Sequence, residues 1–267
     1  MKKKIDIIIQ FIIGIFLLII TLFPILWMLG LAVRPMDELV GNITLLPQKF
    51  TLEHFFALFV EKNFGTALKN SMITTLTSLV ISLACGLTCA YILARSRFQL
   101  KTKKIVTYWI LLVRVLPPIS FAIPLYILFS KTQMLSTLVP VISACVFINI
   151  PLTVWFIISF FQGLSVEIEE SAQMDGATEW QLFIKVVLPL VLPGIAAISM
   201  LSFIYAWNEY TYSVIFVQSS KQYTVPIALS ILNTEDNVNQ FGQVAAGGIV
   251  SLIPMAIFVA FAQKYLI

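Results

Sequence analysis

Residues 167–193 read Glu167-Ile-Glu-Glu-Ser-Ala-Gln-Met-Asp-Gly176-Ala-Thr-Glu-Trp-Gln-Leu-Phe-Ile-Lys-Val-Val-Leu-Pro189-Leu-Val-Leu-Pro193, a polar stretch between two apolar ones. Carboxylates crowd its beginning, at Glu167, Glu169 and Glu170, and negative charge suits the positive end of a helix dipole. Asp175-Gly176 indicates a turn, because glycine readily takes the left-handed conformation that ends a helix. The stretch therefore predicts a short helix that ends near Gly176.

A second helix is predicted to begin at Thr178, because Gln181 three residues later completes a capping-box pattern. Its apolar residues recur at helical intervals and form one face: Trp180, Phe183, Ile184, Val187 and Leu188. Pro189 is expected to close this helix, because proline lacks the N–H that a helix needs. Taken alone, such a pair of helices is also typical of a solvated loop that only joins two membrane spans.

The order of residues in this stretch resembles the EAA loop of permease subunits of ATP-binding cassette (ABC) importers. The family pattern is Glu-Ala-Ala, three residues, Gly, nine residues and Ile-x-Leu-Pro. Here it is Glu170-Ser-Ala172, Gly176 and Val186-x-Leu188-Pro189, with every spacing kept and with Ser and Val in place of Ala and Ile. Met174-Asp175-Gly176-Ala177 resembles the version in carbohydrate permeases of the maltose type. The chain is similar to their second permease, over residues 68–267 well and over the first span loosely.

The resemblance implies a loop that docks into a groove on a cytoplasmic ATPase. The implied ATPase-coupling residues are Glu169, Glu170, Ala172, Asp175, Gly176, Ala177, Leu188 and Pro189. The implied partners are a second permease, two ATP-binding cassette subunits and an extracellular solute-binding lipoprotein or periplasmic protein. The sequence contains no Gly-x-x-x-x-Gly-Lys-Ser/Thr phosphate-binding loop. We therefore expect no cofactor and no catalysis in this chain, with ATP and Mg²⁺ bound by the partner ATPases.

Composition predicts an all-α polytopic membrane protein. Of the 267 residues, 59% are hydrophobic and 11% charged, and the mean hydropathy is +0.95. A helix needs ~20 apolar residues to cross a membrane, and six spans are predicted, at 7–33, 68–94, 105–129, 137–161, 190–217 and 244–262. Residues 1–67 would form the first span and an outer segment. Residues 68–267 would form the permease domain with its coupling loop at 162–189, and the resemblance implies the type I importer fold.

The basic residues predict the orientation of the spans. Residues 95–104 carry five basic side chains and no acid, which places this loop in the cytoplasm. Lys2, Lys3 and Lys4 place the amino terminus on the same side, and Lys264 marks the inner end of the last span. We therefore expect a bacterial or archaeal cell membrane protein with both termini cytoplasmic. The basic residues flank apolar runs, so they do not predict binding of nucleic acid.

The remaining segments carry weaker signals. Residues 34–67 are expected to hold a short amphipathic helix outside the membrane, and residues 218–243 a polar outer loop. The only histidine, His54, is expected at the surface, and Cys85, Cys89 and Cys145 are expected to be small packing residues. In the second span, Asn70-Ser71, Ala90-Tyr91 and Ala94-Arg95 resemble the opening of the family's permease domain.

Three polar residues inside predicted spans are candidates for function, namely Arg114, Asn208 and Glu209. Trp207-Asn208-Glu209 again resembles maltose-type permeases. Straight helices would place Arg114 ~15 Å and Glu209 ~24 Å from the inner side. Two interpretations stay open: the two charges pair with help from proline kinks, or Glu209 meets water near an outer gate.

These observations predict a permease subunit that couples ATP hydrolysis by its partners to carbohydrate import by alternating access. One alternative is an ion-coupled secondary transporter built around Glu209, although such proteins usually show inverted repeats. Another is an ABC importer for a non-sugar polar solute. An intramembrane enzyme would need clustered nucleophile, base or metal residues. The lone His54 argues against that class.

Overall fold

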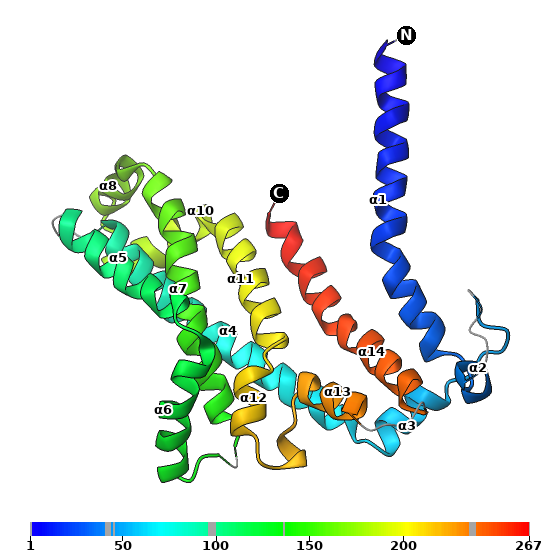
Figure 1. The fold of residues 1–267 in the computed structure, drawn as a ribbon. Coiled ribbons are helices and arrows are strands. Elements are labelled where there is room, and N and C mark those ends of the chain that lie inside the picture. Colours follow the sequence, from blue (N-terminus) through cyan, green and yellow to red (C-terminus); the bar gives the residue numbers. More distant parts are fainter. Residues whose placement is uncertain are drawn as a thin grey trace. The chain divides into compact units, whose positions relative to one another are not determined.

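The computed structural model describes residues 2–40, 44, 46–95, 100–135, 137–234 and 239–266, and every regular element in them is a helix (Figure 1). The longer elements are α1 (Lys2–Ala32), α2 (Met36–Val40), α3 (Glu53–Val60), α4 (Phe64–Arg95), α5 (Leu100–Val115), α6 (Pro118–Lys131), α7 (Val139–Gly163), α8 (Val166–Met174), α11 (Leu192–Trp207), α12 (Thr211–Phe216), α13 (Val225–Thr234) and α14 (Asn239–Ala262). The shorter ones are α9 (Glu179–Gln181), the π-helical η1 (Leu182–Val187), α10 (Leu188–Leu190), η2 (Ser220–Gln222) and η3 (Gln263–Tyr265). The all-α prediction is confirmed.

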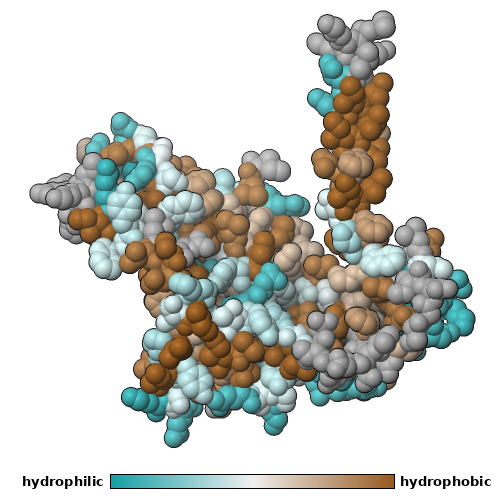
Figure 2. All heavy atoms as spheres, viewed as in Figure 1, coloured by the Kyte–Doolittle hydropathy of each residue, from teal (hydrophilic) through white to brown (hydrophobic). Residues whose placement is uncertain are grey.

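Several of these helices are suited to a membrane. Four described helices are long and apolar enough to cross one: Asp6–Ala32, Phe64–Arg95, Val139–Gly163 and Phe241–Tyr265. A fifth crossing results if Glu179–Leu190 and Leu192–Phe216, which meet at a bend of 78°, count as one span. Figure 2 shows hydrophobic side chains covering the surface of α1, where they are exposed along the helix. Such a surface needs lipid or another protein to cover it.

Two predicted spans are not continuous helices. The span expected at 105–129 is divided between α5 and α6, because Pro117 has no N–H and disfavours helical backbone at the residue before it. The span expected at 190–217 is divided at residues 208–210, between α11 and α12. The segment at 218–243, expected to be polar and outside the membrane, includes the helix α13.

The chain forms two units, residues 1–65 with 228–253 and residues 66–227 with 254–267. In the first unit His54 is buried, so the expectation of a surface histidine is wrong. Its Nε2 lies 2.8 Å from the carbonyl oxygen of Arg34. Gly242 makes room for the ring, because a Cβ at that position would fall 2.2 Å from His54 Nε2.

In the second unit, one hydrophobic cluster joins α4, α7 and the helices that follow α8. Its buried members are Leu87, Ala90, Leu93, Val154, Ile157, Phe161, Leu182, Phe183, Val187 and Val191. We call it the inner cluster. Another cluster joins α6, α7 and α12 around the buried Cys145, which confirms its expected role in packing. At the start of α4, Asn70 Nδ2 donates to the carbonyls of Lys221 and Tyr223 at 2.9 and 3.0 Å.

Candidate functional site

The helix–turn–helix predicted from residues 167–189 is present, and local chemistry explains its first half. Glu167 and Glu169 lie in the first turn of α8. Gly176 has φ +85°, and the Ala177 N–H closes the turn by donating to the Ala172 carbonyl at 3.0 Å. This is the left-handed helix ending that glycine favours.

The start of the second helix is also as predicted. The N–H of Gln181 donates to Thr178 Oγ1 at 3.3 Å, and the N–H of Thr178 donates to Gln181 Oε1 at 3.0 Å. These reciprocal bonds complete the capping box and satisfy two backbone donors that would otherwise lack helical partners.

The buried face of this second helix differs from the predicted one. After Gln181 the backbone widens into η1, where the Leu188 N–H donates to the carbonyl of Phe183, five residues back. Phe183 and Val187 are buried as predicted and Leu182 is buried with them, whereas Trp180 and Ile184 are exposed. Pro189 does not close the helix, which continues through α10, and the sharp bend follows at Val191.

Six of the eight residues implied to couple to an ATPase fall into two groups. Ala172, Asp175, Gly176 and Ala177 line one open hollow of about 340 Å³ with Gln181, Lys185 and Val186. Leu188 packs against the inner cluster, and Pro189 is exposed at the far end of the loop. The structure therefore brings the turn residues together, while Leu188 and Pro189 lie outside this hollow and only Leu188 is anchored in the inner cluster.

One member of the expected set, Glu169, faces the protein rather than a partner. Its Oε1 accepts a hydrogen bond from Arg95 Nε at 2.6 Å, and its Oε2 accepts one from the Tyr91 hydroxyl at 3.1 Å. Arg95 Nη2 also donates to the Leu164 carbonyl at 3.0 Å, just before α8 begins. We call Tyr91, Arg95 and Glu169 the α4–α8 latch, because these three side chains tie α8 to the end of α4.

Sequence reasoning missed this latch. It assigned Arg95 to a basic loop and Glu169 to a helix dipole, and each assignment is chemically sensible by itself. One signal in the sequence pointed to the α4 side of the latch. Ala90-Tyr91 and Ala94-Arg95 resemble the opening of the family's domain, and Tyr91 and Arg95, four residues apart, lie on one helical face.

The exposed side chains of the loop include a carboxylate and large apolar groups. Glu170 is exposed, Met174 is 88% exposed and Trp180 is 66% exposed. Methionine and tryptophan are favoured in protein interfaces, where they supply adaptable or extensive apolar contact. We call Glu170, Met174 and Trp180 the docking face.

The intramembrane candidates lie at the break between α11 and α12. Both carboxylate oxygens of Glu209 accept backbone N–H bonds, from Tyr212 at 2.7 Å and from Ser213 at 2.9 Å. The Ser213 hydroxyl adds a bond at 2.9 Å. Glu209 thus caps α12, whereas Asn208 is exposed and donates to the Ile204 carbonyl at 2.8 Å. The side chain of Arg114 lies outside the described residues, so its pairing with Glu209 stays one of two open interpretations.

Comparison with known proteins agrees with this architecture. The model of the family described as "Binding-protein-dependent transport system inner membrane component" matches residues 85–267. The inner membrane ABC transporter permease protein YcjP of Escherichia coli is 30% identical over 253 residues, which cover 93% of this chain and 89% of that protein. The diacetylchitobiose uptake system permease protein DasC of Streptomyces coelicolor is 31% identical, covering 94% of this chain and 91% of its own. The trehalose transport system permease protein SugB of Mycobacterium tuberculosis is 30% identical, with 92% and 89% covered.

A solved structure shows the same fold. One chain of a bacterial ABC transporter involved in import of the acidic polysaccharide alginate superimposes with a TM-score of 0.81 at 23% identity, covering 99% of this chain and 97% of that one. By sequence and by fold, the chain belongs to the family of inner membrane components of binding-protein-dependent ABC transport systems.

Proposed function

We propose that this chain is one of two permease subunits of an ATP-driven carbohydrate importer. It would pair with a second permease, two ATPase subunits that bind ATP and Mg²⁺, and an extracellular solute-binding protein. The chain itself carries out no chemistry in this proposal. It converts movement of the ATPases into alternating access across the membrane.

The observation that carries the proposal is an exposed docking face on a loop that is firmly attached to the spans. Met174 and Trp180 present apolar surface that a soluble partner would bury, and Glu170 adds an exposed charge on the same loop. The same loop is held from behind by the α4–α8 latch and by Leu182, Phe183 and Val187 in the inner cluster. A partner that moves this face would therefore move α4 and α7 as well.

The sequence of events follows from this attachment. When ATP closes the ATPase dimer, each docking groove moves and carries α8 with it. The latch and the inner cluster transmit the displacement to α4, α7 and α11, which re-open the path outward. Packed cores pass such displacements on because they have low compressibility. Hydrolysis then resets the ATPases and the spans.

Two further elements of the proposal are the substrate class and the orientation. Relatives named for diacetylchitobiose and trehalose transport support a carbohydrate substrate. The basic residues of 95–104 and the coupling loop support a cytoplasmic location for the α8 end of the second unit. The lysines at positions 2–4 and Lys264 support the same location for the two termini. A secondary transporter built around Glu209 is disfavoured, because the bonds that cap α12 occupy its carboxylate.

The proposal is tested by purification of the complex from native membranes, using two glycine positions as a matched pair. A Cβ added at either Gly176 or Gly163 would meet open space, but only Gly176 has a positive φ. Gly176→Val is therefore expected to distort the turn and lose the co-purified ATPase, and Gly163→Val is expected to keep it. Retention of the ATPase and of ATP-dependent sugar uptake by Gly176→Val would contradict the proposal.

A further inference from the structure

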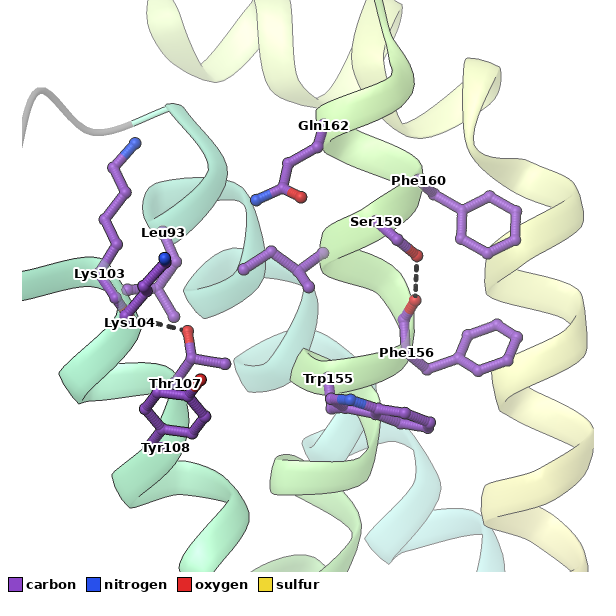
Figure 3. Close-up of a pocket in the computed structure, with 11 residues that line it drawn as sticks. Leu93, Lys103, Lys104, Thr107, Tyr108, Trp155, Phe156, Ser159, Phe160 and Gln162 are labelled. Carbon is purple, nitrogen blue, oxygen red and sulfur yellow. Dashed lines mark hydrogen bonds between the residues drawn. The ribbon is translucent and has the colours of Figure 1, made fainter. Parts of the chain in front are cut away.

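A groove in the second unit combines lysines with aromatic rings. It lies between the last turn of α4, the first turns of α5 and the last turns of α7, and it encloses about 670 Å³ (Figure 3). We call it the lysine–aromatic groove. The residues that matter here are Lys103, Lys104, Tyr108, Trp155, Phe156 and Gln162.

The groove changes from polar to apolar along its length. Lys103, Lys104 and Gln162 lie at one end. Tyr108 is four residues beyond Lys104 and Trp155 is seven residues before Gln162, which places the rings ~6–10 Å further along their helices. Tyr108 and Trp155 are 69% and 51% exposed. Exposed tyrosine and tryptophan rings at the end of membrane spans are typical of the lipid headgroup level.

The hydrogen-bonding groups at the polar end are only partly occupied. Lys103 Nζ donates to the Ala94 carbonyl at 3.3 Å. Thr107 Oγ1 and Ser159 Oγ are turned to carbonyls of their own helices, at 2.9 and 3.0 Å, as the dashed lines in Figure 3 show. Within the described part of the chain, the side chains of Lys104 and Gln162 have no such partner. None of the described residues that line the groove is acidic.

We propose that the lysine–aromatic groove binds one anionic phospholipid. Its phosphate would lie against the ammonium groups of Lys103 and Lys104, with the Gln162 amide as a further donor. The glycerol and upper acyl chains would lie along Trp155, Tyr108 and Phe156. Two lysines in a groove whose described lining holds no acid favour an anion, and basic pockets between spans are typical sites for acidic headgroups. The apolar continuation of the groove favours a lipid over free phosphate. The inference requires only that the chain spans a membrane.

The test uses the tryptophan that lies in the groove as its reporter. The whole complex is placed in vesicles whose lipids carry brominated acyl chains, either phosphatidylglycerol or phosphatidylcholine, and quenching of tryptophan fluorescence is measured. The chain has five tryptophans, so the signal of Trp155 is the difference between the parent complex and Trp155→Phe. We expect Trp155 to be quenched preferentially by the anionic lipid, and added salt to weaken the preference.

Charge variants identify the groove as the source of this preference. Lys103→Gln/Lys104→Gln is expected to lower the relative affinity for phosphatidylglycerol on the order of tenfold. Lys103→Arg/Lys104→Arg is expected to retain it. Lys131→Gln/Lys221→Gln removes the same charge from exposed lysines outside the groove and is expected to change nothing.

Three results would overturn the inference, and none of them depends on transport activity. Equal quenching of Trp155 by both lipids would mean ordinary boundary lipid. An absence of Trp155 quenching would mean that another subunit covers the groove. An unchanged preference in Lys103→Gln/Lys104→Gln would place the anionic site elsewhere. Retention of the co-purified ATPase by Gly176→Val, which would contradict the proposed function, leaves this measurement intact.

Discussion

Removal of the Glu169 carboxylate should uncouple α8 from α4. Arg95 Nε lies 2.6 Å from Glu169 Oε1, and the two side chains are only 18% and 10% exposed. A hydrogen bond to a charged group contributes about 1.5–3 kcal/mol, and removal of one partner from a fully buried pair costs about 3–5 kcal/mol. Because this pair keeps some contact with solvent, we expect Glu169→Ala to weaken the attachment of α8 by about 2–3 kcal/mol.

The assay is a double-mutant cycle on ATPase docking. Binding of the purified ATPase to the permease complex is measured for Arg95→Ala, Glu169→Ala and the double variant. A 2 kcal/mol loss corresponds to about thirtyfold weaker binding if all of it appears at the docking face. Arg95→Ala also loses the hydrogen bond to the Leu164 carbonyl, so of the two single variants it is expected to bind the ATPase more weakly. The double variant should bind the ATPase about as well as Arg95→Ala, because the bond to Glu169 is already lost there.

Glu170 supplies the matched control for this cycle. It is the neighbouring carboxylate, but it is exposed and belongs to the docking face. Glu170→Ala should weaken ATPase binding through the partner contact alone, so its effect should add to that of Arg95→Ala. Additivity of Arg95→Ala with Glu169→Ala within about 0.5 kcal/mol would refute the latch, because coupled residues do not add.

Three other predictions concern the docking face, the inner packing and the helix break. Trp180→Ala should reduce co-purified ATPase several-fold without lowering the membrane level of the chain, and equal co-purification would argue against the docking face. Gly86→Val should lower the amount of the chain in the membrane, measured on immunoblots, because a Cβ at Gly86 would meet Thr153 Cγ2 at 2.6 Å. Adding Thr153→Ala to Gly86→Val should partly restore that amount. Glu209→Gln should lower thermal stability by about 1–2 kcal/mol through a weaker cap on α12 while ATP-driven uptake persists. Abolished uptake in a stably folded Glu209→Gln complex would instead indicate an ion-coupling role.

Much of the coupling loop was predictable because its determinants are local. The dipole of α8 attracts Glu167, the positive φ at residue 176 requires glycine, and the cap at Thr178 needs only Gln181 three residues away. Each of these effects acts within one helical turn, so neighbouring residues contain the whole cause. The apolar runs can likewise be recognised from the sequence alone, and the all-α membrane architecture follows from them.

Other features depended on residues far apart in the sequence. Glu169 accepts a hydrogen bond from Arg95, which lies 74 positions earlier in the sequence. His54 is buried because Gly242 leaves space for its ring. Trp180 is exposed although its helical periodicity placed it with Phe183, whereas Leu182 and Phe183 are buried in the inner cluster.

The sequence by itself determined the spans' apolar character, the helix–turn–helix of the loop and the family to which its motif points, because short-range sterics, dipoles and hydropathy decide these. Only the tertiary structure decided which carboxylate of the loop faces inward, which apolar side chains remain for a partner, and how Glu209 is used at a helix break. The physical reason is that burial and pairing belong to the space between helices, and that space exists only after they pack.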